Sequence, residues 1–137
     1  MSFLLDTNAM IAILNDRPQV VRSHWHAVRA ASTRVATSSI VLFELMAGAY
    51  KSARTKQNLA LIHNLLASPL HVVAFEREDA DCAGQIRAAL ERKGQPIGHY
   101  DLLIAGQALR HGFTLVTANV GEFRRVKGLV VENWEVP

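Results

Sequence analysis

Three acidic residues stand in apolar surroundings, where a carboxylate is costly to bury. Asp6 ends "SFLLD", Glu44 lies inside "IVLFELMAGA", and Asp101 precedes "LLIA". An unpaired carboxylate in an apolar environment costs several kcal/mol unless something compensates its charge. If the fold brings these three to one cleft, their repulsion calls for a divalent cation, and Mg²⁺ or Mn²⁺ prefers such oxygen ligands. The acids therefore predict a metal site held by Asp6, Glu44 and Asp101.

Each acid also has a simpler interpretation. Asp6 stands where a strand gives way to a helix, so it could cap that helix. Asp101 could occupy the first turn of a helix, where negative charge is favourable. Glu44 lies in mid-helix, where capping is impossible, but its carboxylate could reach water at the rim of the molecule. Both interpretations of each acid stay open at this point.

The elements that must position these acids alternate between short apolar runs and helical patterns. Strands are predicted at 2–5, 34–38, 71–75, 113–117 and 129–132, the last at an edge. Helices are predicted at 9–15 with Thr7 or Asn8 as cap, at 19–31, from Ser38 or Ser39 to about 50, at 55–68, at 76–93, and from about Asp101 onward. Strands separated by helices favour a parallel α/β sheet, in which ligands bind at the carboxyl ends of the strands. Asp6 and Asn119 both follow a predicted strand.

Composition bounds the class of protein. The 137 residues predict a single domain, 1–137, and 50% hydrophobic with 20% charged residues is typical of a folded globular chain. Cys82 is the one cysteine, the first residues lack the basic segment of a signal peptide, and no apolar run is long enough to span a bilayer, so we expect a cytoplasmic protein. The net charge of +3 permits a polyanionic partner without requiring one.

Four motifs carry a family resemblance. "LLDTN", "FELMAGA", "IGHYDLLIAGQAL" and "LVTANVGEF" resemble, in order and spacing, the PIN-domain ribonucleases, and among them the VapC-type toxins of bacterial toxin–antitoxin pairs. The resemblance spans nearly the whole chain. It implies a PIN-like three-layer α/β/α fold with a central, mainly parallel sheet of four to five strands. It also implies a metal-dependent endoribonuclease whose Mg²⁺ or Mn²⁺ is held by the matching residues Asp6, Glu44 and Asp101.

The fourth position of the family's site departs from the pattern. Where the family often has Asp, this chain has Asn119, a neutral oxygen ligand or a water-orienting amide. Whether a second cation binds therefore stays open. Glu122 could partly substitute, although "GEF" could equally be a surface turn. We expect metal-activated attack of water, with Asp6 and Asp101 as principal ligands and Glu44 as a ligand or a water-orienting base. Asn119 would complete the catalytic set.

Substrate and partners follow from the resemblance and from charge. The nearest group is that of the tRNA(fMet)-specific endonuclease VapC, which implies cleavage in the anticodon loop of initiator tRNA, and a VapB-type antitoxin as partner. Apolar faces on the helices at 39–50 and 55–68 predict a homodimer. Candidate contacts to RNA phosphates are the basic residues Lys51, Arg54, Lys56, Arg92, Lys93, Arg124, Arg125 and Lys127. In each cluster a solvated surface is the simpler alternative.

Other functions fit less well. A haloacid-dehalogenase-like phosphotransferase needs a second acid two residues after the first, where this chain has Asn8. A non-catalytic PIN-fold subunit for RNA binding or interaction would be expected to lose an acid, whereas three persist. The six histidines show no metal-ligand spacing, and His99, two residues before Asp101, is the one nearest to the predicted site.

Overall fold

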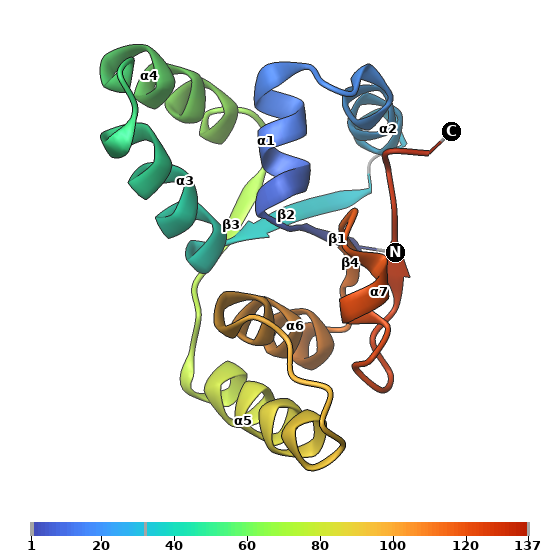
Figure 1. Cartoon of the computed structure of the whole chain (residues 1–137). Coiled ribbons are helices and arrows are strands. Elements are labelled where there is room, and N and C mark those ends of the chain that lie inside the picture. The colour runs from blue at the N-terminus through green and yellow to red at the C-terminus, as the bar shows by residue number, and fades with distance from the viewer. Residues whose placement is uncertain (1, 32, 137) are drawn as a thin grey trace.

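The computed structural model describes residues 2–31 and 33–136 and has a parallel β-sheet at its centre (Figure 1). Within those residues the elements in chain order are β1 (Ser2–Leu5), α1 (Thr7–Asn15), α2 (Gln19–Ala30), β2 (Arg34–Ser38), α3 (Ser39–Lys51), α4 (Thr55–Leu66), β3 (His71–Val73), α5 (Arg77–Arg92), α6 (His99–His111), β4 (Thr114–Val116), α7 (Val120–Phe123) and β5 (Val131–Glu132). The strand order is β3-β2-β1-β4-β5, and all four neighbouring pairs are parallel. Helices α1 and α2 lie on one side of the sheet, and α6 lies on the other with α5 outside it. The predicted three-layer α/β/α fold is confirmed.

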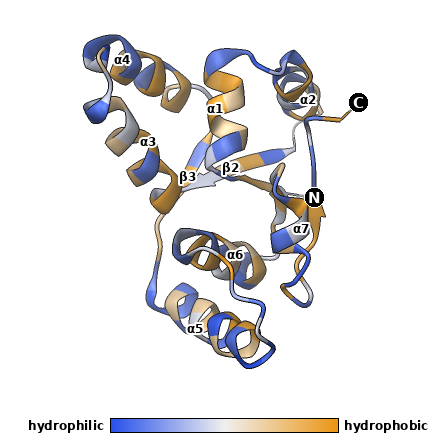
Figure 2. Ribbon diagram, viewed as in Figure 1, coloured by the Kyte–Doolittle hydropathy of each residue, from blue (hydrophilic) through white to orange (hydrophobic). Residues whose placement is uncertain are grey.

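The central strand β1 is buried on both faces. Phe3 lies opposite Val35 of β2 and Thr114 of β4, and Leu4 and Leu5 have no exposed surface. A continuous apolar run suits this position because helices cover both faces of a parallel sheet. Figure 2 shows hydrophobic residues on β1 and on the inner sides of the helices, with hydrophilic residues on the outer turns of α4 and α5.

The direction of the chain across the sheet reverses beside β1. The chain passes from β1 to β2 and β3 at one edge, and then returns through α5 and α6 to β4 on the other side of β1. Such a reversal opens a crevice at the carboxyl ends of the strands on either side of it. The Asp6 amide donates to the Val116 carbonyl oxygen over 3.1 Å, which ties together the two strand ends at this crevice.

The sequence leaves three residues open as the cap of the first helix. Asp6, rather than Thr7 or Asn8, is its N-cap, and Asp6 Oδ1 accepts a hydrogen bond from the Ala9 amide at 2.8 Å. The reason is that Asp6 still has the extended backbone of the strand, while Thr7 is already helical. The last strand, β5, lies at the edge as predicted but is reduced to Val131–Glu132.

Helix α6 is fixed firmly against its neighbours. A Cβ atom at Gly106 would lie 2.7 Å from the Cβ of Ala83, so α5 and α6 approach too closely there for any larger residue. The buried Gln107 donates from Nε2 to the carbonyl oxygens of Val73 and Ala74, at 3.0 and 3.1 Å, and thereby joins α6 to the end of β3. These contacts hold the helix whose first turn carries Asp101.

Within the described ranges, every helix is too short or too polar to cross a membrane.

Candidate active site

Asp6 is a buried carboxylate at the carboxyl end of β1, where its backbone amide binds the last residue of β4. Its residue is 4% exposed, and it accepts hydrogen bonds from the Ala9 amide and the Thr117 hydroxyl. Burial raises the pKa of Asp6 to about 6, with the charges of Asp101 and Glu44 adding to the rise and the two hydrogen bonds opposing it. Asp6 therefore caps α1 and also belongs to an acidic cluster, so its two interpretations are compatible.

Glu44 reaches the same cluster from the middle of α3. That helix begins where the Ser38 hydroxyl accepts a hydrogen bond from the Ile40 amide, at 3.0 Å. Glu44 is partly buried, and its Oε1 accepts a hydrogen bond from the Thr7 hydroxyl at 2.7 Å. The side chain thus faces α1 and the acids rather than standing alone at the rim in water.

Asp101 lies in the first turn of α6, whose N-cap is Gly98. Burial raises the pKa of the Asp101 carboxyl, and the charges of Glu122 and Glu44 raise it further. A position at a helix N-terminus would by itself lower this pKa, so burial and the acidic neighbours together outweigh the helix here.

Asn119 and Glu122 add polar groups to the acidic cluster from the segment that follows β4. Asn119 donates from Nδ2 to Glu122 Oε2 at 2.6 Å, and its own amide donates to the Thr117 hydroxyl at 3.0 Å. Glu122 belongs to the short helix α7, so the alternative of a plain surface turn for "GEF" is wrong. Its charge acts on Asp101, which places Glu122 with the acids.

Two hydroxyl residues of this site were not predicted as site residues from the sequence. The Thr7 hydroxyl donates a hydrogen bond to Glu44. The Thr117 hydroxyl donates a hydrogen bond to Asp6 and accepts one from the Asn119 backbone amide. Their signal was position alone: Thr7 directly follows Asp6 in "LLDTN", and Thr117 directly follows β4, two residues before Asn119. Threonine is so common at strand and helix ends that this signal has little specificity.

The donor set suits a hard divalent cation. The charges of Asp101 and Glu44 raise the pKa of Asp6, those of Glu122 and Glu44 raise the pKa of Asp101, and a cation between these carboxylates would offset both their burial and their repulsion. In the part of the chain that the structure describes, no three acidic, histidine or cysteine side chains already surround one point as ligands. Glu44 accepts the Thr7 hydrogen bond on Oε1 and Glu122 accepts the Asn119 hydrogen bond on Oε2, so each bond occupies one of the two oxygens of its carboxylate.

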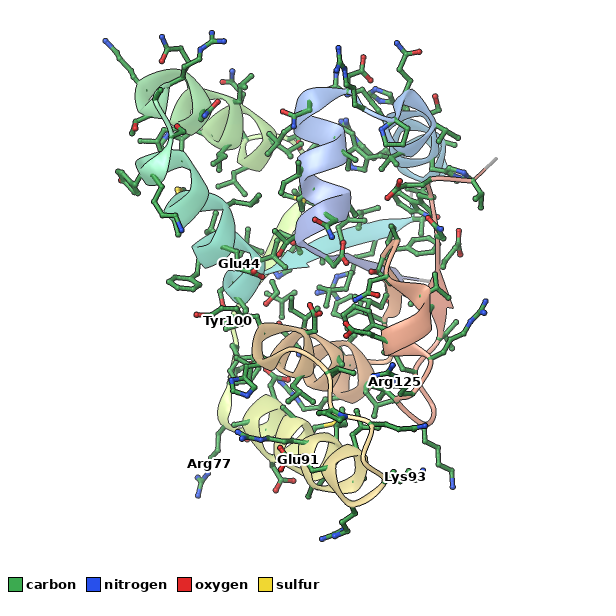
Figure 3. The ribbon with its side chains drawn as sticks, in the orientation of Figure 1. Glu44, Arg77, Glu91, Lys93, Tyr100 and Arg125 are labelled. Atoms are coloured by element: carbon green, nitrogen blue, oxygen red, sulfur yellow. The ribbon has the colours of Figure 1, made fainter. Side chains whose placement is uncertain are left out.

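Two of the histidines and two of the basic residues that were candidates for RNA contacts lie away from the site acids. His24 stacks on Trp134 with ring centroids 5.7 Å apart, and His111 lies 3.6 Å from Asp79. His99, in the first turn of α6, lines a pocket between α5 and α6 instead. In Figure 3, Lys93 and Arg125 lie toward the opposite end of α6 from Glu44.

Known proteins match this chain over almost its whole length. The model of the PIN domain matches residues 3–129. The chain is 40% identical to the tRNA(fMet)-specific endonuclease VapC of Salmonella typhimurium, covering 98% of both chains, and 37% identical to ribonuclease VapC2 of Rickettsia felis, covering 98% of this chain and 99% of the relative. The crystal structure of VapBC2 from Rickettsia felis, bound to a DNA fragment from their promoter, superposes with a TM-score of 0.90 at 36% identity, covering 98% of this chain and 99% of that one. This chain therefore belongs to the PIN-domain family, among the VapC proteins.

Proposed function

We propose that this chain is an endoribonuclease that hydrolyses RNA phosphodiester bonds with the help of Mg²⁺ or Mn²⁺. The observation that carries the proposal is Asp6, a buried carboxylate whose pKa is raised to about 6 with two further acids beside it. A group of acids kept together at such a cost is typical of a functional site. The names of the relatives, ribonuclease and tRNA(fMet)-specific endonuclease, support the same activity.

Each residue of the site has a role in this proposal. Asp6 and Asp101 hold the cation, and Glu44 serves as a third ligand or as the base that orients the attacking water. When bound, the cation lowers the pKa of water and shields the negative charge that develops on the phosphate. Thr7 and Thr117 position Glu44 and Asp6 through their hydroxyl groups. Asn119 orients Glu122, which adds negative charge beside Asp101.

We propose further that the substrate is a tRNA, cut in the anticodon loop of initiator tRNA, and that a VapB-type antitoxin is the partner. The name of the Salmonella typhimurium relative supports the first point, and structures of VapBC from Salmonella typhimurium and Rickettsia felis support the second. The chain would act as a single domain in the cytoplasm, where tRNA is found. The homodimer stays a prediction, which sedimentation of the purified chain measures.

Sequencing of RNA ends after brief induced expression tests the proposal in cells. We expect one enriched break in one tRNA, and no such break with Asp101→Asn. In vitro, EDTA should abolish cleavage by the purified chain and excess Mn²⁺ should restore it. Cleavage that persists in EDTA contradicts the metal, and RNA that is bound but never cut indicates a non-catalytic subunit.

A further inference from the structure

Two half-exposed aromatic rings stand directly beside the acids. Phe43 precedes Glu44 on α3, and Tyr100 precedes Asp101 on α6. Their ring centroids are 5.6 Å apart with planes inclined at 55°, so the pair bridges the two helices. Figure 3 shows Tyr100 at the start of α6, below Glu44 on α3.

Neither ring is buried in the hydrophobic core. Phe43 is 53% exposed and Tyr100 is 48% exposed, although each ring has the other as a neighbour. Rings that served the core would be covered, as Phe3 and Phe123 are. About half of the surface of each ring is therefore free to contact another molecule, at the edge of the catalytic site.

The charges around the site indicate which kind of contact is needed there. The charges of Glu44 and Glu122 act on Asp101, so three carboxylates lie near one another, and such a cluster repels a phosphodiester backbone. A nucleobase is uncharged and stacks on aromatic side chains with little dependence on its identity. Stacking is thus the contact that can hold RNA close to the acids without adding a charge.

We propose that Phe43 and Tyr100 form a stacking platform for an unpaired RNA base next to the phosphate that is cut. This inference rests on the proposed function and adds two positioning residues to it. It requires the base to be free of a partner strand, so it also accounts for cleavage in a loop rather than in a helix.

Binding measurements with conservative substitutions test the platform. In an Asp6→Asn background that leaves RNA uncut, Phe43→Leu and Tyr100→Leu keep apolar bulk but remove the flat ring. We expect each substitution to raise the dissociation constant for a fluorescent hairpin RNA that contains the cut site by about 10- to 100-fold. Tyr100→Phe, which keeps the ring, is the matched control and should bind within about twofold of the parent.

An abasic substitution in the RNA identifies the stacked base. Removing the base that stacks should weaken binding to the parent protein as much as Tyr100→Leu does. Combining the two changes should cost little more than either alone, because both remove the same contact. A general structural role of Tyr100 would make the two losses additive, and that result overturns the proposal.

The remaining outcomes separate this inference from the proposed function. If the native chain cuts RNA and both leucine variants bind and cut as it does, the platform is wrong and the nuclease stands. If those variants instead change the sedimentation of the protein while RNA binding stays constant, the rings belong to a contact between protein chains, which also overturns the platform. If the native chain cuts no RNA, the proposed function itself fails.

Discussion

Two buried aspartates of this chain have opposite surroundings. Asp6, at the end of β1, is 4% exposed and has carboxylates as its charged neighbours. Asp79, in the first turn of α5, has no exposed surface, and its Oδ1 lies 2.5 Å from Arg110 Nε and 3.6 Å from His111 Nε2. Burial alone would raise the pKa of both. The guanidinium of Arg110, the Glu76 amide and His111 hold the pKa of Asp79 below its usual value, whereas the pKa of Asp6 rises to about 6.

The two aspartates differ in whether the chain itself supplies a countercharge. Asp79 has its countercharge within the chain and joins α5 to the end of α6. Among the described residues, the charged groups that act on Asp6 are both acids, and a cation at the proposed metal site would supply the missing countercharge. Burial of a carboxylate is therefore a poor indicator of function, and the sign of the surrounding charge is a better one.

The largest effect should follow from removing a charge at the acidic site itself. Asp101→Asn keeps the size of the side chain but removes a ligand charge, so we expect RNA cleavage to fall by about a thousandfold or more. The circular dichroism spectrum should stay unchanged, because α6 is held by Gln107 and by its contact with α5. If the variant cut RNA at the native rate, Asp101 would not be a ligand of the catalytic cation.

Asp6→Asn should stabilise the metal-free chain while abolishing cleavage. The folded carboxyl has a pKa of about 6 against an ordinary 3.8, so the folded state holds the proton more tightly. The stability that this protonation contributes is present below pH 4 and is lost as the pH rises through 6. At pH 7 the asparagine should therefore raise the free energy of unfolding by up to about 3 kcal/mol, with no gain below pH 4. Urea unfolding at both pH values in EDTA measures this, and an equal gain at both would refute the explanation.

Asp79→Asn should have the opposite sign. The amide oxygen can still accept the Glu76 amide, at present 2.7 Å from Oδ2, so the change isolates the charge that Arg110 and His111 neutralise. We expect the free energy of unfolding at pH 7 to fall by about 2 kcal/mol. Because the pKa of Asp79 is lowered, the native advantage should shrink as the pH falls below 3.8. A stabilised variant would mean that the pairing with Arg110 does not compensate burial.

The smallest effect should come from Glu122→Gln. Glutamine can still accept the Asn119 amide, while the negative charge that raises the pKa of Asp101 is lost. We expect about threefold weaker binding of Mn²⁺, measured by calorimetry, and a similarly modest loss of cleavage. A loss as large as that of Asp101→Asn would instead identify Glu122 as a ligand.

Most of the fold could be predicted from the sequence because the hydrophobic periodicity of its strands and helices is clear. The run "SFLL" followed by helices predicts a buried central strand, and the alternation of strands and helices predicts the parallel sheet. The cap of α1 stayed open among Asp6, Thr7 and Asn8 because all three are good caps, and the backbone conformation chooses among them.

The acids of the site were visible in the sequence because charge stands out in apolar surroundings. Asp6, Glu44 and Asp101 are each flanked by several apolar residues. Thr7, Thr117 and the tie between Asn119 and Glu122 were not visible, because a hydroxyl or an amide is ordinary at the end of any element. Their roles depend on which distant segments meet, and no local pattern contains that information.

The pairing of β1 with β4 joins segments that lie more than a hundred residues apart in a chain of 137. During synthesis, Asp6 therefore leaves the ribosome well before the strand that its backbone amide binds, so the acidic site cannot assemble until β4 has been made and has paired with β1.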